Sequence, residues 1–173
     1  MVSINAENFA QRFPTFASAL SSNALDSLLR TLKLQEFEAS EALIDEGTLS
    51  DSLFFVWDGE LDVLMKTPDG ERKVARLEAG ALFGEISVLS PGLATATVRS
   101  EQGCTALHLT RSNLEQFWQD HPRAAAVFMR ELSKLVARRI RAADDMLNQL
   151  LSGGDYQPDA LIAVHAKLLK ETD

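Results

Sequence analysis

Turn-forming residues divide the segment from about Phe37 to Leu109 into short apolar runs, and this division limits the possible folds more than any other feature. The runs are rich in Val, Leu and Phe, and the breaks fall at Gly47, Gly59, Pro68-Asp69-Gly70, Gly80, Pro91-Gly92 and Gly103. Turns about ten residues apart are typical of a β-barrel or sandwich. The clearest hairpin joins residues 60–66 to 71–77, because Asp69-Gly70 tolerates a positive φ between two alternating runs.

Helical patterns flank this β segment. Before it, Asn23 is predicted as the N-cap of a short helix whose leucines share one face. After it, apolar residues recur every three or four positions through 122–151. At about 1.5 Å per residue this helix would reach roughly 40 Å, more than a compact domain of this size needs. We therefore expect a homodimer through this helix, with packing on the chain's own barrel as the alternative.

The 173 residues suit one globular domain with a small appendage. We predict a helical segment at 1–36, the β-barrel at 37–121, the long helix at 122–152 and a tail helix within 153–173. Gly153-Gly154 can end the long helix, and Gln157-Pro158 is typical of a helix start.

Charge and composition exclude several classes of partner. The net charge of −8 and the sequence pI of about 4.9 disfavour nucleic acids and anionic membranes. The long helix is locally basic, which we interpret as a solvated face or as pairing with the chain's own carboxylates; its cations are Arg130, Lys134, Arg138, Arg139 and Arg141.

The start of the chain lacks a signal-peptide pattern, and the apolar runs are too short to cross a bilayer. We expect a cytoplasmic protein without nucleic-acid or membrane partners.

No pattern predicts catalysis or a metal site. His108, His121 and His165 are too scattered for a His-x-His cluster, and no Ser, His and Asp grouping stands out. A single cysteine in a strand, Cys104, is more typical of packing than of redox sensing, and it has no partner for an internal disulfide. We expect no catalytic residues, no metal and no cofactor.

Three glycine-containing motifs together resemble one known family. They occupy residues 43–60, 77–86 and 90–98. On these motifs the chain, from roughly Phe13 to Leu150, resembles the cyclic nucleotide-binding domains of bacterial catabolite-type regulators, kinase regulatory subunits and gated channels. The resemblance implies an α+β fold, in which a jelly-roll barrel (a double-stranded β-helix) carries an N-terminal helix, a short cassette helix and a long C-terminal helix.

The same resemblance implies a ligand site in residues 83–97, called the cassette below. The candidate ligand-binding residues are Phe83, Gly84, Glu85, Ile86, Ser87, Ala94, Thr95 and Thr97. A short helix opening at Gly84 would aim free backbone N–H groups at a cyclic phosphate. Glu85 matches the family's acceptor for a ribose hydroxyl. Thr95 and Thr97 either add hydroxyl donors or are ordinary strand residues.

One position departs from the family pattern. The phosphate-clamping arginine falls on Ala94, which has no charge and no side-chain donor. A charge-assisted hydrogen bond contributes about 1.5–3 kcal/mol, so its loss weakens binding about ten- to a hundred-and-fifty-fold. The candidate substitutes lie on the neighbouring hairpin and are Arg72, Lys73 and Arg76. Arg99 lies five residues further along the strand and is not expected to reach the phosphate.

The leading hypothesis is a non-enzymatic regulatory protein whose barrel reports occupancy by cyclic AMP or cyclic GMP through the long helix. We expect the output to lie in a partner protein, because the family's transcription factors carry a helix-turn-helix domain where this sequence has about twenty residues. Two alternatives remain open. One is a dimeric interaction module with an inactive pocket, and the other is a sensor for a changed ligand, such as a cyclic dinucleotide or an uncharged effector.

Overall fold

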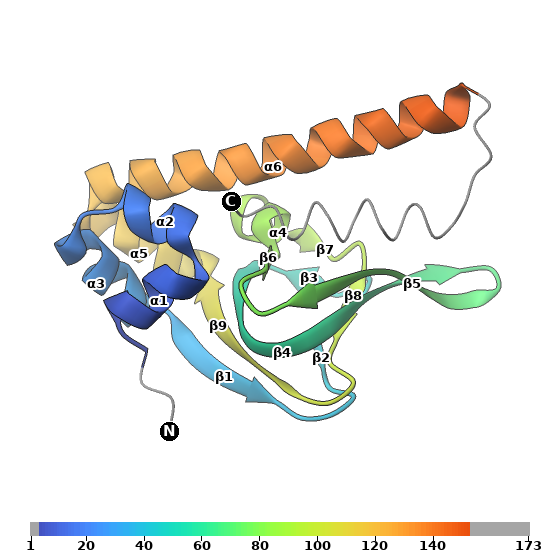
Figure 1. Cartoon of the computed structure of the whole chain (residues 1–173), viewed down its shortest axis with the longest axis horizontal. Coiled ribbons are helices and arrows are strands. Elements are labelled where there is room, and N and C mark those ends of the chain that lie inside the picture. Colours follow the sequence, from blue (N-terminus) through green and yellow to red (C-terminus); the bar gives the residue numbers. More distant parts are fainter. Residues whose placement is uncertain (1–3, 153–173) are drawn as a thin grey trace.

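The computed structural model describes residues 4–152, apart from the side chains at positions 146, 147 and 149–151. A curled antiparallel sheet lies beside a group of helices, and helix α6 runs across both (Figure 1). The helices are α1 (Ala6–Arg12), α2 (Pro14–Ala19), α3 (Ser22–Thr31), α4 (Glu85–Leu89), α5 (Arg111–Asp120) and α6 (Pro122–Leu151). The strands are β1 (Lys33–Phe37), β2 (Ala42–Ile44), β3 (Leu49–Ser50), β4 (Ser52–Thr67), β5 (Gly70–Glu78), β6 (Leu82–Phe83), β7 (Gly92–Leu93), β8 (Thr97–Arg99) and β9 (Cys104–Thr110). This is the predicted α+β arrangement; the predicted tail helix lies outside the described residues.

The N-terminal helices differ from the prediction. Three helices precede the sheet instead of one, and α3 has Ser21 as its N-cap, so Asn23 as the cap was wrong. Ser21 has an extended backbone, and its carbonyl accepts the Leu25 N–H at 2.9 Å, which places Asn23 inside the first turn. Helix α1 opens with reciprocal Asn5 and Asn8 bonds, a variant of the capping box that carries Asn where Glu or Gln is usual.

Strand β4 organises the sheet because it pairs with β5, β6, β8 and β9. The predicted hairpin is confirmed: Lys66 pairs with Glu71 and Thr67 with Gly70. Alternate side chains of β4 face opposite sides, so Leu53, Phe55 and Trp57 join the core under the helices while Phe54 and Val56 join the barrel interior. Both faces are covered, and residues 52–57 are therefore all buried. Helix α5, which the β pattern did not predict, follows β9 with Thr110 as its N-cap.

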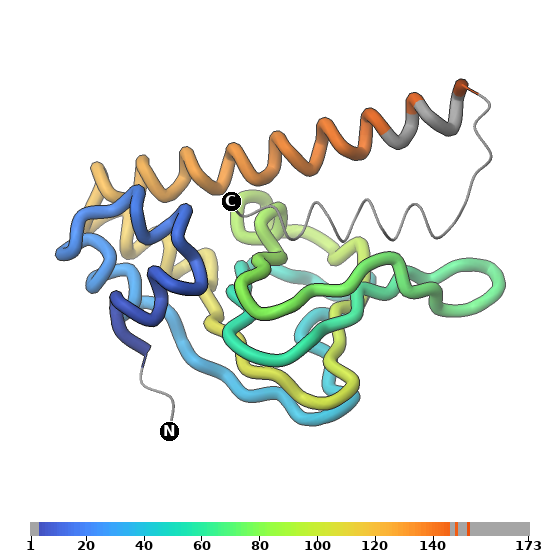
Figure 2. The backbone as a smooth tube through the Cα atoms, in the orientation of Figure 1, coloured from blue at the N-terminus to red at the C-terminus, as the bar shows by residue number. Residues whose placement is uncertain are grey.

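An aromatic cluster fixes the first half of α6 to the rest of the domain. The ring centroids of Phe16 and Phe128 lie 5.3 Å apart, and those of Phe13 and Phe55 lie 5.1 Å apart. Ala125, Phe128, Leu132 and Leu135 are buried, whereas Ile140 is 56% exposed. Figure 2 shows α6 continuing past the N-terminal helices and over the region of α4. The first half of α6, through Leu135, is therefore anchored in the core and is called the root of the helix. The second half extends over the cassette.

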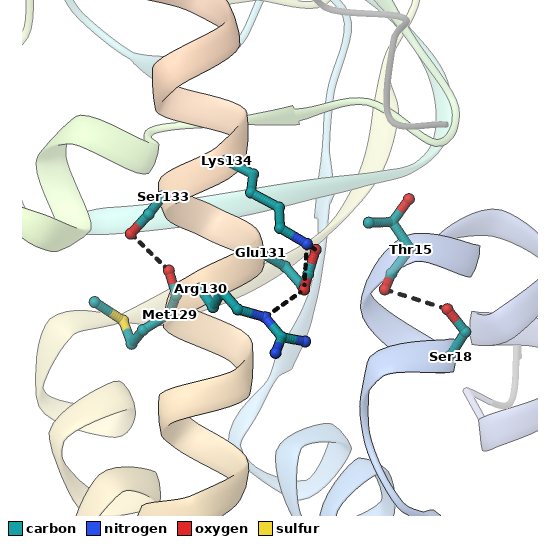
Figure 3. A network of polar contacts seen from close by, with 7 residues as sticks. All are labelled: Thr15, Ser18, Met129, Arg130, Glu131, Ser133 and Lys134. Atoms are coloured by element: carbon teal, nitrogen blue, oxygen red, sulfur yellow. Dashed lines mark hydrogen bonds and ion pairs between the residues drawn. The ribbon is translucent and has the colours of Figure 1, made fainter.

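A buried carboxylate on α6 is the partner of two of the cations on that helix (Figure 3). Glu131 is 6% exposed and accepts hydrogen bonds of 3.0 Å from Arg130 Nε and Lys134 Nζ. Burial alone would raise the pKa of Glu131, but the bonds from Lys134 and Arg130 outweigh burial and lower it. These two cations therefore pair with a carboxylate of their own helix, which is one of the two roles expected for them.

Candidate functional site

The cassette begins at a turn that only glycine fits. Gly84 is the N-cap of α4, with a φ of +81° in the left-handed region. A Cβ at this position would overlap the backbone carbonyl oxygen of Ser52 on β4. Backbone atoms cannot move aside as a flexible side chain could, so the sequence Phe83-Gly84-Glu85 brings the start of α4 directly against the sheet.

Glu85, the predicted ribose acceptor, is buried and already has a charged partner. Its side chain forms an ion pair through Oε2 with Nη1 of Arg139, which projects from α6. Nη2 of Arg139 also donates to the carbonyl of Leu82 at 2.6 Å, just before the cassette. One guanidinium therefore ties the long helix to both sides of the β6–α4 turn.

The sequence pattern left Arg139 either on a solvated face or paired with one of the chain's own carboxylates; the second interpretation is correct, but it did not assign Arg139 to the ligand site. A signal was present, because Arg139 lies four residues after Leu135 and seven after Leu132, on the buried stripe of α6. A cation in that register must lie against the domain, and a buried carboxylate is the partner that keeps its charge tolerable.

Phe83 belongs to a stack that extends into the barrel. Its ring is parallel to that of Phe54 at 4.9 Å, and Phe54 is parallel to His108 at 4.6 Å. Burial lowers the pKa of His108, so the stack contains the neutral imidazole at pH 7. Phe83 therefore fixes the entry to the cassette by packing. Of the next two candidates, Ile86 is 62% exposed and Ser87 is half-buried.

The outgoing part of the cassette is tied to the loop between β2 and β3. Ala94 donates its N–H to Thr48 and accepts the N–H of Gly47, both at 2.8 Å. Thr97 is buried, and its hydroxyl accepts the Glu46 N–H at 3.0 Å. Thr95 is exposed. Thr97 thus holds the first motif against the third, and Thr95 keeps its side chain in solvent.

Of the three cations proposed to replace the missing arginine, Arg72 is exposed, and the other two are engaged elsewhere. Lys73 and Arg76 both contact the buried Asp62, at 2.5 and 3.3 Å, from the neighbouring strand β5. Arg99, which was not expected to reach the phosphate position, pairs with Glu71 at 3.1 Å. These ion pairs lie along the β4–β5 hairpin and β8. The carboxylate of the cassette, Glu85, pairs instead with the guanidinium of Arg139.

The described part of the chain contains neither a metal-binding cluster nor a membrane-spanning helix. Within residues 4–152, no group of three or more His, Cys, Asp or Glu side chains could hold a metal ion. None of the helices that the structure describes is both long and apolar enough to span a membrane. Cys104 is buried, and burial raises the pKa of its thiol to about 11, so little of it is the reactive thiolate at neutral pH.

Comparisons with known proteins agree with this geometry. The chain is 30% identical over 128 residues to the potassium/sodium hyperpolarization-activated cyclic nucleotide-gated channel 2 of Mus musculus; the match covers 74% of this chain but only 14% of the channel. A cyclic nucleotide-binding domain from Methylobacillus flagellatus KT superposes with a TM-score of 0.73 at 20% identity, covering 88% of this chain and 87% of that one.

A second solved structure, the catabolite activator protein of Thermus thermophilus, has a TM-score of 0.69 and 27% identity, covering 79% of this chain and 62% of that one. The model of the cyclic nucleotide-binding domain matches residues 34–121, which is half of the chain. The matched segment contains the barrel, the turn at Gly84 and the whole cassette. The chain belongs to the cyclic nucleotide-binding domain family.

Proposed function

We propose that this chain is a non-enzymatic regulatory sensor in which occupancy of the cassette by a cyclic nucleotide changes the placement of α6. The observation that carries the proposal is the contact of Arg139 with Glu85 and with the Leu82 carbonyl. It joins the output helix to the residue that matches the family's ribose acceptor. A ligand that bonds to Glu85 must change the free energy of this contact.

The way α6 is held suits a population shift. The root of α6 is fixed by the buried side chains of Phe128 and Leu132. Further along the helix, Arg139 contacts the cassette through its ion pair with Glu85. If a ligand favours one position of the second half of α6, that position must in turn favour the ligand by the same factor. The proposed readout is a protein partner in the cytoplasm, or a second copy of this chain that covers the exposed Ile140 on the same helix.

A second candidate is supported by Ala94. With no side-chain donor at this position, the fold could serve as a dimeric interaction module that binds no cyclic nucleotide. The two candidates differ in whether a cyclic nucleotide binds to the purified chain, which calorimetric titration measures directly.

Replacing Ala94 by arginine is expected to tighten the binding of cyclic AMP or cyclic GMP by about ten- to a hundred-and-fifty-fold, because it adds a charge-assisted hydrogen bond to the phosphate. The matched control is Ala79→Arg, which adds the same charge at an exposed position on the turn before Gly80. It is expected to leave affinity within about threefold of the original value. Equal affinities for the original chain and Ala94→Arg would contradict a phosphate at this place. No binding of cyclic AMP or cyclic GMP by either chain would favour the interaction module or a sensor for a changed ligand.

A further inference from the structure

Two buried guanidinium nitrogens lack partners on the part of α6 that reaches the cassette. They are the Nε atoms of Arg138 and Arg139, which are buried and have no hydrogen-bond acceptor within residues 4–152. A buried donor without an acceptor is costly, and native proteins usually satisfy such a donor with a protein group, a water molecule or a bound ligand. Arg139 already contacts Glu85 and Leu82, so its unpartnered Nε is a spare donor beside the cassette, and Arg138 is the preceding residue of the same helix.

The barrel itself is acidic, so an anion bound to it needs a cation from elsewhere. Residues 42–99 contain ten carboxylates and five Lys or Arg side chains, a formal charge of −5. Three of these cations are paired with carboxylates of the same sheet: Lys73, Arg76 and Arg99. Ala94 contributes no charge. An anionic ligand in the cassette would therefore face a net repulsive field unless α6 is in place.

We infer that α6 supplies the positive charge that binds the ligand's phosphate, through Arg139 with Arg138 beside it, in place of a cation on the β7–β8 segment. The inference rests on the proposed function and specifies its chemistry. The ligand is a nucleotide whose ribose hydroxyl bonds to Glu85 and whose phosphate bonds to Arg139. Because the cation belongs to the output helix, an anionic ligand binds tightly only when α6 lies on the cassette.

The test compares cyclic AMP with adenosine, which has the ribose and base but no phosphate. Calorimetric titration of Arg139→Met is expected to show cyclic AMP affinity lowered about ten- to a hundred-and-fifty-fold, and preference for cyclic AMP over adenosine lowered by at least about tenfold. Arg139→Lys should retain much of that preference. The matched control is Arg141→Met, which removes an exposed charge from the same helix and should preserve the preference.

A double variant, Ala94→Arg with Arg139→Met, returns a cation to the sheet side and is expected to recover the preference for cyclic AMP. Far-UV circular dichroism and thermal unfolding show whether each variant is folded. The inference is overturned if Arg139→Met keeps the original preference, or binds cyclic AMP more tightly, because Arg139 would then compete with the ligand. It is also overturned if the unmodified chain binds adenosine without preferring cyclic AMP.

The same data separate this inference from the sensor proposal. If Arg139→Met weakens the binding of cyclic AMP and of adenosine equally, the loss of affinity acts through the placement of α6. The sensor proposal then stands and the charge inference fails. If only cyclic AMP is weakened while the position of α6 does not respond to ligand, the charge inference stands and the sensor proposal fails. Spin-label distances between α6 and the barrel supply the second readout.

Discussion

Replacing Phe128 by alanine is expected to lower the free energy of unfolding by about 3–5 kcal/mol. Phe128 is 1% exposed, and its ring lies 5.3 Å from that of Phe16 on α2. Helices α2 and α6 and the sheet all contribute to this cluster, so the cavity left by the ring cannot collapse easily. Urea unfolding followed by circular dichroism measures the change.

The control for this variant is Leu49→Ala. Leu49 is 77% exposed, and its loss should change stability by less than about 0.5 kcal/mol. A loss below about 1 kcal/mol for Phe128→Ala would mean that the root of α6 is not anchored by this cluster. Helix α6 would then not be a helix that is fixed at one end.

Replacing Gly84 by alanine is expected to lower the free energy of unfolding by about 2 kcal/mol or more and to distort the cassette. A left-handed backbone costs a residue with a Cβ about 1–2 kcal/mol, and overlap with the Ser52 carbonyl adds to that cost. The strand and the turn must separate, which moves Glu85 away from Arg139. Urea unfolding gives the stability, and hydrogen exchange of the amides at 84–89 reports the cassette.

Gly47→Ala is a matched control, because Gly47 has a φ of +82° but no atom within 4 Å of the added methyl group. This variant has the backbone strain without the overlap. It should lower the free energy of unfolding by about 1–2 kcal/mol and leave hydrogen exchange of the amides at 84–89 unchanged. Equal stability losses in the two variants would show that contact with Ser52 does not constrain the cassette.

Much of the fold could be predicted from local patterns. Asp69-Gly70 defines the β4–β5 hairpin, the apolar stripe places α6 at Pro122–Leu151, and Gly84 opens α4. The extra N-terminal helices were missed although Asn5, Asn8 and Pro14 are helix-start residues, because helices this short have a weak periodic signal. Helix α5 was missed because it directly follows β9 with no glycine or proline between them.

The site was harder to predict than the fold. The motif locates Glu85, but its partner Arg139 is 54 residues away, and their contact depends on how α6 crosses α4. The hydroxyl of Thr97 was a candidate for ligand binding, yet it accepts the Glu46 backbone N–H from another loop. Such contacts depend on tertiary packing, which no local pattern encodes. The register of Arg139 on the buried stripe was the one local signal that pointed to it.

The distance between α6 and the barrel, measured with and without ligand, shows whether the cassette and the helix are coupled. Spin labels at Asp144→Cys on α6 and Asp58→Cys on β4 occupy exposed positions, and buried Cys104, with its thiol pKa of about 11, should not compete for the label. Electron–electron double resonance is expected to show one narrow distance distribution with saturating cyclic AMP and a broader one in Arg139→Met. A distribution that does not change with cyclic AMP or with this substitution would contradict coupling between the cassette and α6.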